Sequence, residues 1–187
     1  MADAVRRLDT IAGVDAIAAP AVLAEIGPNM VEFPTAGHCA SWAGLCPGNE
    51  ESAGKRLNSK TRKGSSWLRR VLVQCAWAAS HTKDTYLRSQ FYRLAARRGK
   101  KRALVAVAHT ILVIAWHVLK NGATYQELGG NYFEKRQAEA LQRSLVRRLA
   151  PFNARLFSPP DSAHSTNSPR RDAVRVSDHA FCPWWSR

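Results

Sequence analysis

The sequence is poor in cysteine and has no long uninterrupted apolar run, and each shortage excludes a class of protein. Its four cysteines form no Cys-x-x-Cys pair, and no secretory signal precedes them. They are therefore expected to be reduced thiols in a cytoplasmic protein, not a disulfide framework. The most apolar run, residues 103–119, is interrupted by His109, Thr110 and His117 and is slightly short for a membrane span. A buried core helix is the better interpretation, and no membrane partner is expected.

Acidic residues are also scarce. The chain has 28 Lys and Arg against 14 Asp and Glu, a formal net charge of +14. Such an excess indicates a polyanionic partner, with nucleic acid first and an acidic membrane surface second. Fifteen of the cations and only three acids fall within residues 49–102. The surface that meets the partner is therefore expected to be local.

No strand-like alternation persists along the chain, so the sequence predicts an all-α fold. Apolar periodicity and stop signals predict helices at residues 5–10, 16–26, 36–45, 67–79, 84–98, 103–119 and 133–149. The helix at 103–119 is expected to be the central strut of the core. One stripe of the helix at 67–79 is expected to be buried: Trp67, Leu68, Val71, Leu72, Cys75, Ala76 and Ala79.

The first 30 residues read as two short helices joined by a turn at Gly13. This spacing is similar to a helix-hairpin-helix, which holds a phosphate with backbone N–H groups at a tight turn. Asp15 stands where a second glycine is often found, and its carboxylate would repel phosphate. A purely structural helical hairpin is the alternative. Pro20 is expected to kink the second helix or delay its start.

The segment from Pro47 to Arg70 combines a polar, glycine-containing loop with a run of cations. It has too few apolar residues to stabilise itself by burial, so flanking helices or a bound polyanion must fix its shape. Ser65 and Ser66 can cap the helix that follows. The candidate nucleic-acid-binding residues are the cations of this segment and of the next basic run: Lys55, Arg56, Lys60, Arg62, Lys63, Arg69, Arg70, Arg97, Arg98, Lys100, Lys101 and Arg102. The alternative is a solvated basic surface loop.

Three regions are predicted: a helix-hairpin-helix-like segment at 1–30, a helical domain at 31–150 and a disordered tail at 151–187. Five of the nine prolines fall in the tail, which has no periodicity and ends near an unexplained Trp184-Trp185 pair. The last predicted helix carries a narrow apolar seam that could meet a partner helix: Leu141, Leu145, Val146 and Leu149. No metal site is predicted, because His38, Cys39 and Cys46 match no common zinc spacing.

Four long strings, in order, carry a family resemblance. FPTAGHCASWAGLCPGNEESAGKR, TRKGSSWLRRVLVQCAWAA, RRGKKRALVAVAHTILVIAWHVL and YQELGGNYF resemble the C-terminal transposase domain of the IS110/IS116/IS902 insertion-sequence family. The likeness covers about residues 8–149. It implies DNA transposition, with the serine of the family's Ser-x-Gly-like loop matching Ser52. That serine would attack DNA and form a covalent phosphoserine link.

The resemblance also implies partners and a cofactor. DNA is the expected partner, with a structured guide RNA and a full-length transposase or a second copy as further partners. In the family an N-terminal RuvC-like domain holds the metal in a set of four acids. This chain starts only a few residues before the helical hairpin, and its scarce acids form no Mg²⁺ cluster. Mg²⁺ is thus expected only with that missing domain, and no cofactor in this chain.

Three hypotheses follow. The first is a truncated transposase in which Ser52 is the nucleophile, inactive unless a separate chain provides the metal. The second is a non-catalytic basic protein that binds nucleic acid or the full-length transposase. The third is the product of a decayed gene, suggested by the tail after Pro151, which departs from the family's usual ending.

Overall fold

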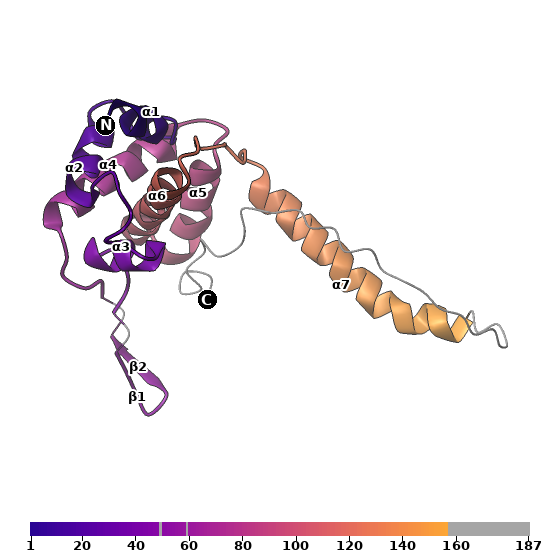
Figure 1. Cartoon of the computed structure of the whole chain (residues 1–187). Helices are drawn as coiled ribbons and strands as arrows, with labels where there is room; N and C mark the ends of the chain where they lie inside the picture. Colours follow the sequence, from indigo (N-terminus) through magenta and orange to yellow (C-terminus); the bar gives the residue numbers. More distant parts are fainter. Residues whose placement is uncertain (49, 59, 157–187) are drawn as a thin grey trace. The chain divides into compact units, whose positions relative to one another are not determined.

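The structure is a computed structural model that describes residues 1–48, 50–58 and 60–156. Within these residues the chain divides into two units, a helical domain at 1–131 and one long helix from residue 132 onward. Figure 1 shows the elements of each. The helices are α1 (Ala2–Asp9), α2 (Ala18–Ile26), α3 (Ala36–Trp42), α4 (Ser66–His81), α5 (Tyr86–Arg98), α6 (Lys100–Asn121) and α7 (Tyr132–Leu156). The all-α prediction is confirmed, with one addition: a two-stranded hairpin of β1 (Glu50–Ser52) and β2 (Lys55–Asn58).

Helix α6 is the centre of the helical domain, as its apolar sequence predicts. It packs against α1, α3, α4 and α5 (Figure 1). Val107, Ile111 and Leu112 are fully buried along it. By length and hydropathy α6 could cross a membrane, but 67% of its most apolar window is buried inside the domain. Such burial is typical of the core helix of a globular domain.

Three helices begin where a hydroxyl group caps the backbone. The side chains of Thr35, Ser65 and Thr85 accept hydrogen bonds from the N–H groups of the third residues of α3, α4 and α5. The predicted cap at Ser65 is therefore confirmed. Pro20 lies in the first turn of α2. Backbone N–H groups in the first turn have no partner within the helix, so the N–H that proline lacks costs no helical hydrogen bond.

Two tryptophans are more exposed than the sequence predicts. Trp67 was expected on the buried stripe of α4, but its side chain is 56% exposed. The buried stripe instead runs through Leu68, Leu72, Cys75 and Ala79, and Trp67 lies one position, or about 100°, to the side of it. Trp42 of α3, another large apolar side chain that favours burial, is 43% exposed, with its ring tilted against Phe33.

The N-terminal helical hairpin packs on α4. Gly13 has φ of +85°, and a Cβ there would lie 2.5 Å from the carbonyl oxygen of Cys75. The Asp15 carboxylate accepts the N–H groups of Ile17 and Ala18 at 3.2 and 2.7 Å. These N–H groups at the start of α2 already have an acceptor, so the geometry gives no support to a phosphate site there. The phosphate-binding role stays a prediction.

Helix α7 is the second unit and continues through Pro151 to Leu156, past the predicted start of the tail. Its predicted seam residues, from Leu141 to Leu149, are exposed by 47–62%. Residues 157–187, with Trp184 and Trp185, lie outside the part of the chain that the structure describes.

Burial of His109 in α6 generates a pH prediction. Its side chain is 4% exposed, and burial lowers its pKa from 6.5 to about 4. Below pH 6.5 the unfolded chain therefore binds a proton that the folded chain does not, so stability falls as the pH falls toward 4. Between pH 7 and pH 5 this group should cost about 2 kcal/mol of unfolding free energy.

Urea unfolding at the two pH values measures this loss. His109→Gln should remove most of it, whereas His81→Gln, a change at an exposed histidine of α4, should keep it. An equal pH dependence in His109→Gln and in the unchanged protein would show that His109 is not its source.

Candidate nucleic-acid interface

The described residues between 46 and 63 form an extended hairpin, here called the basic arm, which projects from the helices α3 and α4 (Figure 1). Backbone hydrogen bonds join its two sides close to the helices. Gly48 N–H donates to Lys60 O at 2.7 Å, and Arg62 N–H donates to Cys46 O at 3.3 Å. Pro47 and Thr61 form an antiparallel bridge between them. The arm therefore obtains its shape from backbone pairing, not from burial of apolar side chains.

The base of the basic arm is a backbone-to-backbone contact between Gly44 and Gly64. A Cβ on Gly64 would lie 2.4 Å from the nitrogen of Gly44 and 2.4 Å from Trp42 O. Directly after this contact, Ser65 N–H donates to Trp42 O at 3.3 Å. Only glycine lets the two ends of the arm approach this closely.

Ser52 lies at the tip of the basic arm, as the last residue of β1. It pairs with Lys55, the first residue of β2, across the two-residue turn Ala53-Gly54. Both turn residues have positive φ, 49° and 73°, as in the tight turns that suit the twist of a hairpin. Ser52 and Lys55 are both exposed. The predicted loop is thus a hairpin, which the sequence did not indicate because strands of three and four residues are too short to show alternation.

The basic arm and the start of α4 carry seven of the predicted cations. Lys55 lies at the tip, and Lys60, Arg62 and Lys63 lie on the returning side. Arg69 and Arg70 follow in the first turns of α4, Arg69 half-buried and Arg70 exposed. The backbone of Arg56 lies in β2, and its side chain lies outside the described part.

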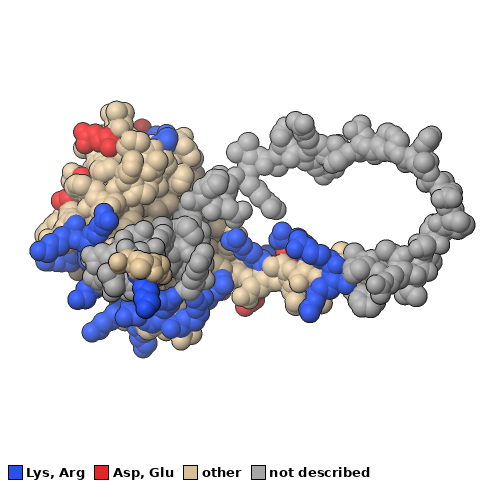
Figure 2. Space-filling model, turned by 90° about the horizontal axis from the view of Figure 1, so that it is seen from below, with Lys and Arg blue, Asp and Glu red and all other residues tan. Residues whose placement is uncertain are grey.

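Most of this positive charge is not neutralised within the domain. Among the described residues, Arg62, Lys63 and Arg70 make no ion pair with a carboxylate. Figure 2 looks onto the face from which the hairpin projects and shows Lys and Arg side chains gathered on it, with Asp and Glu side chains at its edge. The described side chains of this face therefore carry an excess of positive charge, which would attract an anionic strand.

A second basic group lies at the junction of α5 and α6, where Gly99 breaks the helix with φ of +83°. Its five predicted members are exposed: Arg97, Arg98, Lys100, Lys101 and Arg102. The chain thus presents its predicted cations as two groups on different elements. Membership of both groups in one interface stays a prediction.

Two features of the site escaped the sequence analysis. Glu25 of α2 accepts a hydrogen bond from the Ser65 hydroxyl at 3.0 Å, while the same hydroxyl caps α4. No local pattern links residues forty positions apart, so this contact had no sequence signal. Trp67 stands exposed beside the cations, although its apolar character favoured the core.

Ser52 has no metal-binding group around it among the side chains that the structure describes. Within the described residues no group of three or more His, Cys, Asp or Glu side chains could hold a metal ion. The side chains of Glu50 and Glu51 are not described. The described residues therefore do not fit a Mg²⁺ site.

A helical domain that projects an exposed serine on a basic hairpin has the surface expected of a protein that meets nucleic-acid phosphates. The comparisons narrow this class to one family: residues 5–98 match the model of the transposase IS116/IS110/IS902 family, and the chain belongs to that family. The family resemblance of the sequence is thereby confirmed.

Three relatives support the assignment. The chain is 32% identical over 130 residues to "Putative transposase y4pF/y4sB" of Sinorhizobium fredii, covering 67% of this chain and 33% of the relative. It is 30% identical over 125 residues to the transposase for insertion sequence element IS1111A of Coxiella burnetii, covering 65% and 34%. It is 30% identical over 122 residues to the insertion element IS110 43.6 kDa protein of Streptomyces coelicolor, covering 64% and 29%. The chain matches about a third of the length of these relatives.

The glycine contact at the base of the basic arm generates a stability prediction. Gly64→Ala would place a methyl group 2.4 Å from backbone atoms of α3 and Gly44, so something must shift. We expect it to lower the unfolding free energy by about 2–4 kcal/mol, as overpacking against backbone does. Denaturant unfolding followed by circular dichroism measures this loss.

Gly37→Ala is the matched control. Gly37 lies in α3, where a Cβ would meet only the Thr35 hydroxyl at 3.6 Å. Because alanine favours helix over glycine, this variant should be neutral or slightly more stable. Equal unfolding free energies of Gly64→Ala and Gly37→Ala would mean that the base of the arm accommodates a methyl group without loss of stability.

Proposed function

We propose that this chain is a DNA-binding part of an insertion-sequence transposase and that Ser52 is its nucleophile. One observation supports this proposal above others: the Ser52 hydroxyl is exposed at a two-residue turn, opposite Lys55, on an arm rich in cations. The hairpin holds this hydroxyl away from the helices, where a DNA backbone can approach it. The basic arm supplies charge that attracts that backbone.

The chemical step is the attack of Ser52 Oγ on a DNA phosphorus atom. The hydroxyl loses its proton, a new Oγ–P bond forms, and one bridging oxygen of the phosphodiester leaves and takes up a proton. The product is a phosphoserine ester and a free DNA end. Lys55 lies closest in the hairpin register to stabilise the charge on the phosphoryl oxygens.

One requirement of this step is not met by the described residues. A serine hydroxyl needs a base or a metal to lower its effective pKa, and the described residues hold no metal-binding group. We propose that a RuvC-like domain of a full-length transposase provides this activation. This chain alone is expected to bind DNA without cleaving it.

A non-catalytic role is the second candidate. The cations Arg62, Lys63 and Arg70 make no ion pair among the described residues and do not depend on Ser52 for their position. A chain of this kind could occupy DNA, a structured guide RNA or the full-length transposase without any chemistry. In both roles we propose a cytoplasmic protein, in keeping with the buried thiols of Cys39 and Cys75, which form no disulfide bond among the described residues.

Covalent trapping tests the nucleophile. The chain is mixed with transposon-end DNA, Mg²⁺ and a full-length relative whose own matching serine is replaced, and adducts are separated on a denaturing gel. We expect an adduct of the mass of this chain, lost by at least tenfold in Ser52→Ala because no other group replaces the hydroxyl.

Ser66→Ala is the matched control, since Ser66 is an exposed serine in the same basic region. It should leave the adduct yield unchanged. An adduct that persists in Ser52→Ala, or that is lost equally in Ser66→Ala, would remove Ser52 from the role.

Salt dependence tests the binding role separately. DNA affinity should fall steeply with salt, because each phosphate contact releases a counterion. Replacing Arg62, Lys63, Arg69 and Arg70 with Gln should reduce the slope of log K against log salt by about 3–4. Ser52→Ala should leave the slope unchanged. Binding that ignores salt, to DNA and to structured RNA alike, would contradict both roles.

A further inference from the structure

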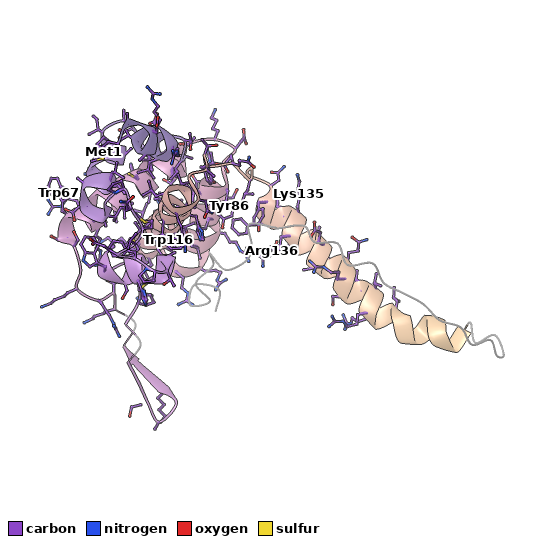
Figure 3. All side chains as sticks on the ribbon, in the orientation of Figure 1. Met1, Trp67, Tyr86, Trp116, Lys135 and Arg136 are labelled. Carbon is purple, nitrogen blue, oxygen red and sulfur yellow. The ribbon has the colours of Figure 1, made fainter. Side chains whose placement is uncertain are left out.

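Trp67 is an exposed tryptophan at the basic end of α4. Its side chain is 56% exposed, in the first turn of the helix. Figure 3 shows Trp67 at the outer side of the helical domain, away from Trp116. A tryptophan so exposed keeps a large apolar face in water, which is unfavourable unless a partner covers it.

The other described tryptophans all have partners inside the domain. The ring of Trp42 contacts Phe33 at 5.7 Å between centroids, and the ring of Trp77 contacts His81 at 4.7 Å. The indole N–H of Trp116 donates to Phe33 O at 2.9 Å. Among the described residues, Trp67 has neither a ring partner nor a hydrogen bond for its indole. Its ring is available to a group from another molecule.

Exposed cations lie on both sides of Trp67 in the sequence. Arg70 lies three residues further along α4 and so on the same face, with Cβ atoms about 5–6 Å apart. Lys63 lies two residues before the cap of α4, and both of these cations are exposed. Because the cap Ser65 is bonded to Glu25 and to Leu68 N–H, the start of α4 is held in place. The backbone that carries the indole and Arg70 is therefore fixed, and Lys63 lies close before it in the sequence.

We infer that Trp67 stacks on an unpaired nucleobase while Lys63 and Arg70 bind the phosphates beside it. This inference rests on the proposed nucleic-acid function and adds that the bound segment is single-stranded. Aromatic side chains stack on unpaired bases, with cations along the backbone, where proteins hold single strands. In a continuous duplex both faces of each base are covered by neighbouring bases, so an indole on a helix surface cannot reach them.

Fluorescence anisotropy of labelled oligonucleotides tests this inference on the full chain. The probes are a 20-nucleotide oligo-dT, the matching oligo-rU, and a duplex of equal length. Trp67→Ala should weaken binding of a single strand about tenfold, in the range of the loss of one stacked base. Duplex binding should change less than about twofold, because the cations remain. Trp67→Phe should retain most of the single-strand affinity, since a smaller ring still stacks.

Trp77→Ala is the matched control. Trp77 is 53% exposed on the same helix, about 15 Å further along, in a stretch with no Lys or Arg. This variant should bind all three probes as the unchanged protein does. The salt slope of Trp67→Ala should also stay unchanged, because stacking releases no counterion, whereas Lys63→Gln with Arg70→Gln should lower it by about 2.

The outcomes separate this inference from the proposed function. If the unchanged protein binds none of the probes, the nucleic-acid function fails and the inference with it. A second result is that the unchanged protein binds the probes while Trp67→Ala weakens duplex and single-strand binding equally, or weakens neither. Either pattern would overturn the stacking role and leave the binding function standing. A loss confined to oligo-dT or to oligo-rU supports stacking and identifies the strand as DNA or RNA.

Discussion

The contact between Gly44 and Gly64 is the constraint on which the candidate site depends. It closes the basic arm at its base, where no side chain larger than hydrogen fits. Ser65 follows at once, and its backbone N–H bonds to Trp42 O while its hydroxyl bonds to Glu25 and caps α4. One point in the chain thus joins α2, α3, α4 and the arm. The direction of the arm and the position of the first turn of α4 are therefore set together.

The two parts joined at this point differ in how they are stabilised. The helical domain buries α6 on several sides and has the apolar contacts that make a region hard to open. The basic arm is stabilised by backbone hydrogen bonds and a tight turn, and its described cations are mostly exposed. Local opening should cost less free energy in the arm than in α6. An arm of this kind can adjust to a bound strand while its base stays fixed by the helices.

How far the sequence predicts this structure depends on the range of the interactions. Helices α4, α5 and α6 follow from apolar periodicity, and the Ser65 cap follows from a rule that spans three residues. The Glu25–Ser65 hydrogen bond and the Gly44–Gly64 approach join distant positions, for which a single sequence carries no signal. The sequence wrongly predicts that Trp67 is buried. A helical period over thirteen residues does not distinguish the centre of the buried stripe from its edge, where Trp67 lies. The exposure of Ser52 beside Lys55 agrees with the predicted site, whereas its chemical role is still a prediction.

An exposed serine with no activating group among the described side chains has a functional consequence. An ordinary serine hydroxyl at neutral pH is almost entirely protonated and attacks a phosphodiester very slowly, however many cations surround it. On the proposed function, the cations of the arm can therefore bind nucleic acid while the serine does not react with it. On the proposed function, reaction begins only when another part of a transposase brings a base or metal to the tip of the arm. Binding and chemistry are then controlled separately: binding by the cations and Trp67, chemistry by assembly. On the proposed function, this separation confines cleavage to the DNA sites where the complete transposase assembles.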